Sequence, residues 1–374
     1  MSKNLNKVTI CKRCVSNTTI PGFEVNENDC NYCELHDKLN IQYPIEHSVL
    51  DNMIRQIKEA GKGKGHDCII GVSGGCDSSY LLYKAVEWGL KPLAVHYDNG
   101  WNSEIAKSNM DKMISALNVP IDVYAMDPGE ANDIWKSFLK AGVPDIEAPT
   151  DIALATVAYR AADKYNVKYI LDGHSFRTEG VAPLGVSYMD GKYIADVHRK
   201  FGSQDFNTFP NLWLSSWMKW LFKGIKRVRP LYHIEYNKEE AKKFLNDKFD
   251  WEWYDHHHGE NIFTSFFRNH FRNNICGIDS RITECSALIR SGQMERSDAL
   301  KLLETPLEYS SDIEIVRNRL SMTTDEWDRA MRFPIRNHKD FKNYKATFKK
   351  LKFLFWIAYK KELVPKTFYI KYCK

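Results

Sequence analysis

The chain has 374 residues, of which 43% are hydrophobic, 27% charged and 13% aromatic. This composition is typical of a globular protein and excludes a disordered, collagenous or coiled-coil chain. The length predicts two or three domains with a large buried core. No uninterrupted apolar run approaches the roughly 20 residues of a membrane-spanning helix, and no apolar secretory segment follows the first residues. We therefore expect a cytoplasmic protein without a transmembrane segment.

The net charge of +5 is unevenly distributed. Residues 339–374 contain eleven lysines and two acidic residues, so the first 338 residues carry a net charge of −4. A broad nucleic-acid-binding face is not indicated, and we expect no nucleic acid among the partners. The spacing of apolar side chains in this tail predicts one helix, packed on an aromatic stripe, whose lysines face solvent or, less favoured, an acidic ligand. The stripe consists of Phe341, Tyr344, Phe348, Leu351 and Phe355.

Four of the nine cysteines form two Cys-x2-Cys pairs near the start of the chain. They are Cys11, Cys14, Cys30 and Cys33. Two such pairs joined by a short loop can close a tetrahedral four-sulfur site, and a reducing compartment disfavours the alternative of two disulfides. A four-cysteine site leaves no open coordination position, so we expect structural zinc in a module of residues 1–45, which is too small to hold a core without metal.

Strand and helix patterns alternate after the glycine- and lysine-rich segment 61–65. We predict strands at 68–72, 92–96, 121–125 and 167–171, and helices at 77–88, 103–117 and about 150–165. This alternation predicts a doubly wound parallel sheet that binds ligands at the carboxyl ends of its strands. Beyond about residue 235 helical patterns dominate. We therefore expect an α/β domain over 46–235 and a helical substrate or partner region over 236–374.

The segment Ser73-Gly74-Gly75-Cys76-Asp77-Ser78-Ser79 follows the first predicted strand and opens a helix. Glycines allow a sharp turn, helix N-terminal N–H groups attract anions, and Asp77 could hold Mg2+ against phosphate oxygens. The Lys-Ser/Thr ending of a Walker A loop is missing. The string resembles the SGGxDS signature of PP-loop ATP pyrophosphatases, which cleave ATP between the α and β phosphates. The alternative is a Gly-Ser turn that opens an ordinary helix.

This resemblance implies the residues of an ATP site. Asp77 and Glu179 would be catalytic, with Mg2+ at Asp77. ATP-binding positions would be Ser73, Gly74, Gly75, Asp77, Ser78, Ser79, His96, Gly173 and Arg229. Arg229 belongs to an Arg-Pro-Leu triplet that resembles a phosphate-supporting element of these enzymes. Asp98 and Asn99 follow the second strand, where they could bind a ligand or simply form a turn.

Much of the chain resembles the N-acetyl sugar amidotransferase family of surface-polysaccharide biosynthesis. The matching segments are Cys11–Val15, Cys30–Cys33, Asp98–Glu104, Ala141–Glu147, Thr150-Asp151, Thr178–Gly180, Phe263–Phe267, Gly277–Arg281 and Ser291–Gln293. The resemblance implies substrate-binding roles for Asp98, Asn99, Asp151, His258 and Glu260. Departures occur at Cys76, where relatives often carry lysine, at Gly173-His174-Ser175, and at 183–188, which lacks an expected tryptophan. The triplet His256–His258 could instead form a solvated turn or a second metal site.

The resemblance also implies a reaction. ATP would adenylylate the amide oxygen of a nucleotide-activated N-acetyl sugar, and ammonia would displace AMP to leave an acetamidino group. The chain has no glutaminase motif, so a separate glutaminase, with a cyclase-like subunit, would supply the ammonia. The alternatives are a PP-loop tRNA thiolation enzyme, although Cys276, Cys285 and Cys373 form no CxxC pair, and a catalytically silent scaffold that binds zinc and nucleotide. The Trp-rich segment 213–222 favours a core helix over a membrane-interface or partner-docking helix.

Overall fold

The fold is built on a parallel five-stranded sheet. The computed structural model describes residues 8–26, 29–181, 188–254, 259–307, 310–332, 334–361, 363–364 and 368–373. The strands are β1 (Cys68–Gly71), β2 (Pro92–Asp98), β3 (Ile121–Ala125), β4 (Tyr169–Leu171) and β5 (Lys226–Val228). They lie in the order β3-β2-β1-β4-β5 with every neighbouring pair parallel. The predicted doubly wound sheet is confirmed, and it contains an additional strand, β5.

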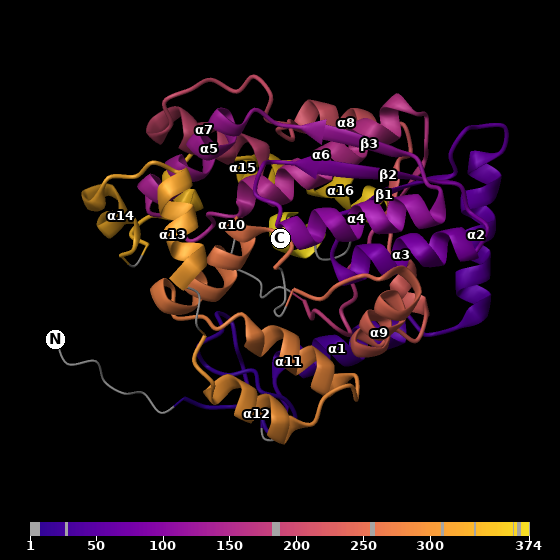
Figure 1. Cartoon of the computed structure of the whole chain (residues 1–374), viewed down its shortest axis with the longest axis horizontal. Coiled ribbons are helices and arrows are strands. Elements are labelled where there is room, and N and C mark those ends of the chain that lie inside the picture. The colour runs from indigo at the N-terminus through magenta and orange to yellow at the C-terminus, as the bar shows by residue number, and fades with distance from the viewer. Residues whose placement is uncertain are drawn as a thin grey trace.

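Helices cover both faces of the sheet because successive strand residues point to opposite sides. Ile69 and Leu93 pack in one core with α5 (Pro128–Ala141), α6 (Ala148–Lys164) and α7 (Gly191–Phe201). Cys68 and Ile70 pack in the other core. That second core also contains α2 (His47–Gly61), α3 (Cys76–Glu87), α4 (Glu104–Leu117) and α9 (Lys238–Phe249). Figure 1 shows α3 and α4 in front of the strands.

All the regular elements described after residue 235 are helical, as the sequence predicts. They are α9, α10 (Ile262–Ser265), the π-helix η2 (Phe266–Ile275), α11 (Arg281–Arg290), α12 (Arg296–Glu304), α13 (Ser310–Arg319), α14 (Thr324–Ala330), η3 (His338–Asp340), α15 (Lys345–Lys350), α16 (Lys352–Lys360) and η4 (Tyr369–Cys373). Before them come α1 (Asn31–Gln42), α8 (Leu214–Phe222) and η1 (Pro230–His233). The proposed domain limits at 45 and 235 remain predictions. No helix within the described ranges is both long and apolar enough to span a membrane.

The C-terminal tail differs from the single predicted helix. Residue Phe341 lies in extended backbone, and α15 and α16 are separate helices that meet at Leu351. Phe348 and Phe355 are nevertheless buried, because Trp217 of α8 packs against both rings. The aromatic spacing therefore identified the buried face but not the break at Leu351.

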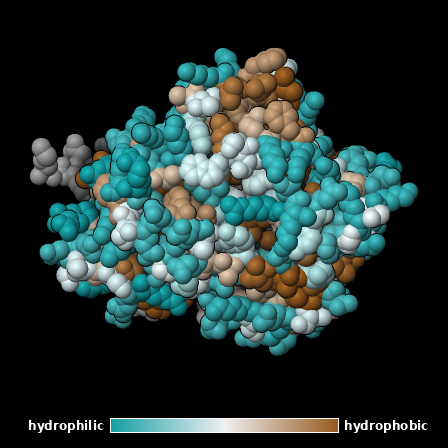
Figure 2. Space-filling model, turned by 90° about the horizontal axis from the view of Figure 1, so that it is seen from above, coloured by the Kyte–Doolittle hydropathy of each residue, from teal (hydrophilic) through white to brown (hydrophobic). Residues whose placement is uncertain are grey.

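The surface carries separate apolar groups among hydrophilic side chains, as the view from above shows (Figure 2). Helix α8 buries Trp220 and Leu221, which agrees with the predicted core helix. Phe222 at its end is 83% exposed, and Phe353 on α16 is 66% exposed.

Candidate active site

The glycine-rich loop lies where the connections of the sheet change direction. From β1 the chain runs outward through β2 to β3, then crosses to β4 on the other side of β1. Open α/β sheets bind ligands at the carboxyl edge at such a switch point. The loop after β1 and the turn after β4 meet there: a Cβ atom added at Gly173 would lie 3.1 Å from the carbonyl oxygen of Asp77. Gly173 thus lies against the loop, and its role in ATP binding remains a prediction.

The loop conformation requires glycine at position 74. Gly74 has a φ of +78°, and an added Cβ would overlap the carbonyl oxygen of Ala106 on α4. Gly75 follows as the N-cap of α3. The hydroxyl groups of Ser73 and Ser78 lie 3.3 Å apart, and that of Ser78 donates to the carbonyl of Gly75 at 3.1 Å. The loop is therefore folded in advance around the N–H groups that open α3.

We expect Gly74→Ala to lower the affinity for ATP by at least about tenfold, because the methyl group must displace either the loop or α4. Isothermal titration with ATP measures the change. Gly65→Ala is the matched control, because an added Cβ there meets nothing within 4 Å. Equal ATP affinities for both variants would contradict this account of the loop.

Asp77 sits in a cluster of charged side chains at the start of α3. The hydroxyl group of Tyr236 donates to Asp77 Oδ1, and Lys238 Nζ lies 3.3 Å from Asp77 Oδ2. Lys238 is only 4% exposed and also lies 3.8 Å from Glu284 Oε1. Burial lowers the pKa of Lys238, but the neighbouring carboxylates outweigh this effect and raise it, so the amine stays charged. The sequence analysis missed Lys238, since a lysine after Asn237 looks like an ordinary first-turn residue.

Glu179 belongs to the same cluster. Burial raises the pKa of Glu179 well above its usual range, with further contributions from the charge of Asp77 and from a hydrogen bond between the two carboxyl groups. His174 Nε2 lies 3.9 Å from Glu179 Oε2, and burial lowers the pKa of His174 to about 4. Because the imidazole of His174 is neutral, it does not offset the charge of Asp77 and Glu179. The adjacent carboxyl oxygens of these two residues are suited to bind a divalent cation.

The structure places Arg229 beside this cluster through Asp172. Arg229 Nε lies 3.1 Å from Asp172 Oδ2, and Arg227 Nε lies 3.1 Å from the same oxygen. Although burial acts to raise the pKa of Asp172, the two arginines lower it, so the carboxylate stays charged. Asp172 thus forms ion pairs with both Arg227 and Arg229 at the carboxyl edge of β4 and β5.

The C-terminal region folds over the loop from the other side. Trp251, which is 1% exposed, donates from Nε1 to the carbonyl of Gly74 at 3.0 Å. A Cβ atom on Gly75 would lie 3.3 Å from the hydroxyl group of Tyr254 and 3.6 Å from Cδ of Glu260. Glu260 is therefore close to the loop, and its predicted role in substrate binding remains a prediction. His258 lies outside the described residues.

Three predicted positions at the end of β2 have bonds within the protein. Both ring nitrogens of His96 are engaged, Nδ1 with the carbonyl of Val72 at 2.8 Å and Nε2 with Asn102 Nδ2 at 2.9 Å. The ring therefore has no free donor or acceptor for a nucleotide. Asp98 accepts from the N–H of Gly100 at 2.8 Å, and Asn99 accepts from the N–H of Trp101 at 3.1 Å. These are the bonds of turn residues, the alternative considered above. Ser79, another of the predicted ATP-binding positions, is buried in α3.

Two carboxyl groups mark the start of α6 at the same edge of the sheet. Asp151 reaches solvent. Protein atoms around its carboxyl group nevertheless displace water and raise its pKa. The charges of Lys371, Arg227 and Arg268 act in the opposite direction. Glu147 is 8% exposed; its Oε1 accepts from the hydroxyl group of Thr264 at 2.7 Å, and Oε2 has no hydrogen-bond partner. Burial raises the pKa of Glu147 to about 8.

We expect the stability of the native chain to fall as pH rises from about 4.3, the usual pKa of glutamate, to about 8, because folded Glu147 keeps a proton that the unfolded chain releases. The slope from this group is at most about 1.4 kcal/mol per pH unit. Glu147→Gln removes the titrating group. The Tm of the variant should therefore rise relative to that of the native protein as pH increases across this window. Parallel curves for the two proteins would contradict the assignment.

The four N-terminal cysteines form a compact cluster. Their Sγ atoms all lie within 4.8 Å of one another. Four of the Sγ–Sγ distances are between 3.6 and 3.9 Å. A disulfide requires about 2.0 Å, whereas four sulfurs about 2.3 Å from a central zinc lie about 3.8 Å apart. The cluster therefore fits a tetrahedral metal and not two disulfides. All four sulfurs are buried, as a structural site requires.

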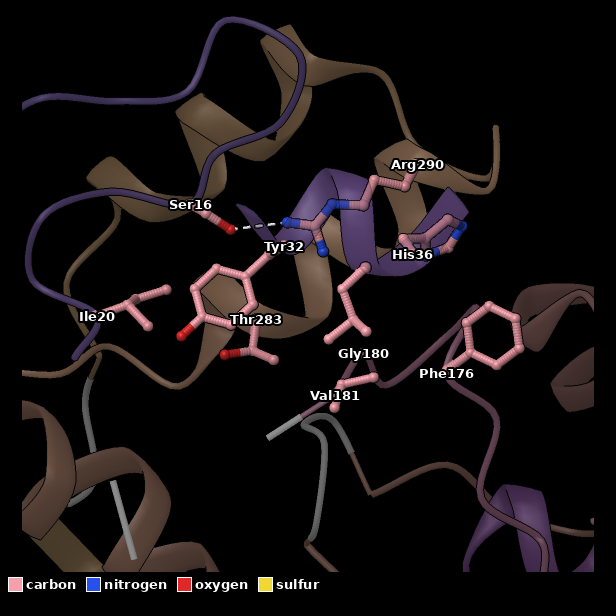
Figure 3. A pocket seen from close by; sticks show the side chains of 10 residues that line it. Ser16, Ile20, Tyr32, His36, Phe176, Gly180, Val181, Thr283 and Arg290 are labelled. Carbon is pink, nitrogen blue, oxygen red and sulfur yellow. Dashed lines mark hydrogen bonds between the residues drawn. The ribbon is translucent and has the colours of Figure 1, made fainter. Parts of the chain in front are cut away.

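The cluster is bound to the C-terminal region through Arg290 of α11. Its Nη2 donates to Cys14 Sγ at 3.1 Å and to the hydroxyl group of Ser16 at 2.9 Å, and its Nε donates to Cys33 Sγ at 3.3 Å. Figure 3 shows this arginine reaching toward Ser16 above Gly180 and Val181. A guanidinium group at this position would offset the excess negative charge of a metal centre with four thiolate ligands.

Other contacts, from α1 and from Ser291, hold the turn that carries Glu179. His36 of α1 packs edge-on against Phe176 with ring centroids 5.3 Å apart (Figure 3). Arg177 donates to Asn40 Oδ1 at 2.9 Å, and its carbonyl accepts from the hydroxyl group of Ser291 at 2.7 Å. The cysteine module therefore positions one side of the candidate site.

Comparison with known proteins gives one family match. Residues 260–354 match the family described as LPS biosynthesis protein WbpG-like, C-terminal domain. This segment of the chain is therefore similar to a WbpG-like C-terminal domain. The match covers about a quarter of the 374 residues and is consistent with the resemblance to surface-polysaccharide proteins. The matched segment contains Glu260 and Glu284, which lie at the loop cluster, and Arg290, which contacts the cysteines. No curated protein matched the chain.

Among solved structures, the chain is similar to NMN synthetase from Francisella tularensis, with 13% identity, a TM-score of 0.34, and coverage of 78% of this chain and 95% of that one. It is also similar to an NH3-dependent NAD synthetase from Campylobacter jejuni, with 12% identity, a TM-score of 0.30, and coverage of 78% and 96%. At these TM-scores neither likeness carries weight for function.

Proposed function

We propose that the chain is an ATP-dependent, AMP-forming amidotransferase of surface-polysaccharide biosynthesis. It would convert the acetamido group of a nucleotide-activated N-acetyl sugar into an acetamidino group. The supporting observation is that one chain combines an SGGxDS loop at the switch point of a parallel sheet with a WbpG-like domain that reaches the loop. A fold alone does not fix a reaction, so the residues around Asp77 carry the mechanism.

An amide is a poor electrophile, so its oxygen must first become a leaving group. The amide oxygen attacks the α-phosphorus of ATP, the bond to the β-phosphate breaks, pyrophosphate leaves, and the amide N–H gives up its proton. Ammonia then attacks the carbon, AMP departs with the former amide oxygen, and one proton of ammonia returns to the nitrogen of the sugar. The products are the acetamidino sugar, AMP and pyrophosphate.

The residues around the loop have distinct roles in this scheme. The N–H groups that open α3 and the hydroxyl groups of Ser73 and Ser78 would bind phosphate oxygens. Asp77 and Glu179 would hold Mg2+, which supplies charge neutralisation as pyrophosphate leaves. Lys238 Nζ lies 3.3 Å from Asp77 Oδ2. It would add a fixed positive charge beside the phosphate oxygens.

Sulfur transfer has less support from the cysteines beyond the loop. Burial raises the pKa of Cys276 to about 11 and that of Cys285 to about 12, and Cys285 is 2% exposed. The thiolate is the reactive form of cysteine, so these groups are poor sulfur carriers.

Pyrophosphate release from Mg-ATP, with ammonium and a panel of UDP- and CMP-linked N-acetyl sugars, tests the proposal. We expect release that depends on the sugar, and a product in which NH replaces one oxygen by mass spectrometry. Asp77→Asn, which keeps the side-chain size, should abolish both signals. Release that requires tRNA and a sulfur source would favour thiolation, and no release with any acceptor would favour a scaffold.

We also propose that a separate glutaminase, with a cyclase-like subunit, supplies ammonia, because most free ammonia is protonated at neutral pH. Glutamine plus that partner should drive amidine formation faster than an equal concentration of ammonium. Equal rates would contradict the partner.

A further inference from the structure

The segment that matches the WbpG-like family contains two arginines that form no ion pair with any carboxylate of the described residues. Arg268 and Arg272 lie four residues apart on the π-helix η2, so they share one side of it. Arg272 Nε is buried and has no hydrogen-bond partner. Throughout the described part of the chain, neither guanidinium group pairs with a carboxylate or donates a hydrogen bond. Burial, and then the charge of Arg268, lowers the pKa of Arg272 to about 10.

Both cations and carboxyl groups surround this pair. Arg268 acts on Glu147, and Lys371 acts on Asp145. Arg268, Arg227 and Lys371 all act on Asp151 at the start of α6. Lys371 is half-buried on η4, where burial lowers its pKa. Asp172, the carboxylate that pairs with Arg227, is shared with Arg229. Desolvation by the surrounding protein raises the pKa of Asp145, Glu147 and Asp151, which weakens these carboxyl groups as counterions for the cations along this edge of the sheet.

Buried charges without partners are costly, and proteins keep them where a ligand completes the pairing. Two guanidinium groups side by side are suited to the oxygens of a phosphate or carboxylate, which they can bind in bidentate fashion. The helix type agrees, because π-helical segments occur frequently at functional sites. Arg227, Asp172 and His174 connect this edge to the Asp77 cluster through successive charge interactions.

We propose that Arg268 and Arg272, assisted by Lys371, bind the anionic group of the acceptor substrate, a phosphate or a carboxylate, and so position its amide at the glycine-rich loop. This inference rests on the proposed function and adds to it the residues that bind the negatively charged group of the acceptor. The phosphates of ATP would lie at the loop itself, so the two anion sites are distinct.

Direct binding tests the subsite without any turnover. The full chain, with zinc present and the ATP site filled by a non-hydrolysable ATP analogue, is titrated with UDP in one arm and with glucuronate in the other. We expect binding in at least one arm, which identifies the source of the anion. Arg268→Gln and Arg272→Gln should each weaken it by about 10- to 100-fold, the range for a lost hydrogen bond to a charged group.

Arg55→Gln, on the exposed face of α2, is the matched control and should bind as the native chain does. Because Arg272 has no acidic partner among the residues that the structure describes, the free Arg272→Gln protein should melt no lower than the native one, whereas a purely structural arginine would lower the Tm. Unchanged affinity in both variants, or no binding of either probe to the native chain, would overturn the subsite.

The subsite and the proposed reaction can fail separately. Arginine-dependent binding of a probe, without nitrogen transfer to any acetamido sugar, would refute the amidotransferase and leave the anion site standing. Amidine formation in which Arg268→Gln and Arg272→Gln keep the native KM for the acceptor would refute the subsite alone.

Discussion

Lys238→Met is expected to reduce turnover by at least about 100-fold and to destabilise the folded chain by about 3 to 5 kcal/mol. Lys238 is 4% exposed and lies between the carboxyl groups of Asp77 and Glu284, at 3.3 and 3.8 Å. Without the ammonium group, the negative charges around Asp77 face each other away from water, and the released pyrophosphate loses a positive neighbour.

Urea unfolding and pyrophosphate release measure the two effects of Lys238→Met. Lys243→Met is the matched control, because Lys243 is exposed on the same helix, α9. Lys238→Arg keeps the charge and should recover part of the stability. Native stability and turnover in Lys238→Met would show that the carboxylates do not depend on this cation.

Cys14→Ser is expected to lose bound zinc and to loosen two distant segments together. A structural zinc site contributes on the order of 10 kcal/mol to the folding of small modules, and residues 1–45 have little other core. The turn with Glu179 should also lose protection, because His36 packs on Phe176 and Asn40 accepts from Arg177. Catalysis should therefore fall although no cysteine of the cluster touches the loop.

Hydrogen exchange measures this coupling: α1 and residues 175–181 should exchange faster in Cys14→Ser, while β1 and β2 stay protected. Zinc content by elemental analysis should fall in parallel. Cys276→Ser, at a half-buried cysteine outside the cluster, should retain both zinc and protection. Faster exchange confined to residues before 45 would show that the module does not support the turn.

Local patterns predicted the sheet and the loop because their signals are contiguous. The apolar residues of β1 and the Gly74–Gly75 pair occur within one stretch, and so do the two Cys-x2-Cys pairs. Strand β5 was not predicted because its three residues, Lys226–Val228, include two cations. They form a strand because they pair with β4 and not because of their own strand propensity. Helix α5 was also missed.

Charge networks between distant segments were beyond the reach of sequence reasoning. Lys238 meets Asp77 only after the chain has completed the sheet and returned through α9, and no spacing rule connects them. His96 shows the converse: its position at a strand end suggested a ligand contact, but Val72 and Asn102 already occupy both ring nitrogens. Spacing identifies groups along one element, whereas tertiary packing decides which atoms remain available.

The covering of the loop by Tyr236, Lys238 and Trp251 has a consequence for the order of events during synthesis. A nascent chain that ends after β5 already contains every strand and the whole glycine-rich loop, yet it lacks the partners of Asp77 and of the Gly74 carbonyl. The cysteine cluster likewise waits for Arg290, more than 250 residues after Cys33. Long-range closure of this kind is slow to form. Assembly of the candidate site is therefore a late folding step.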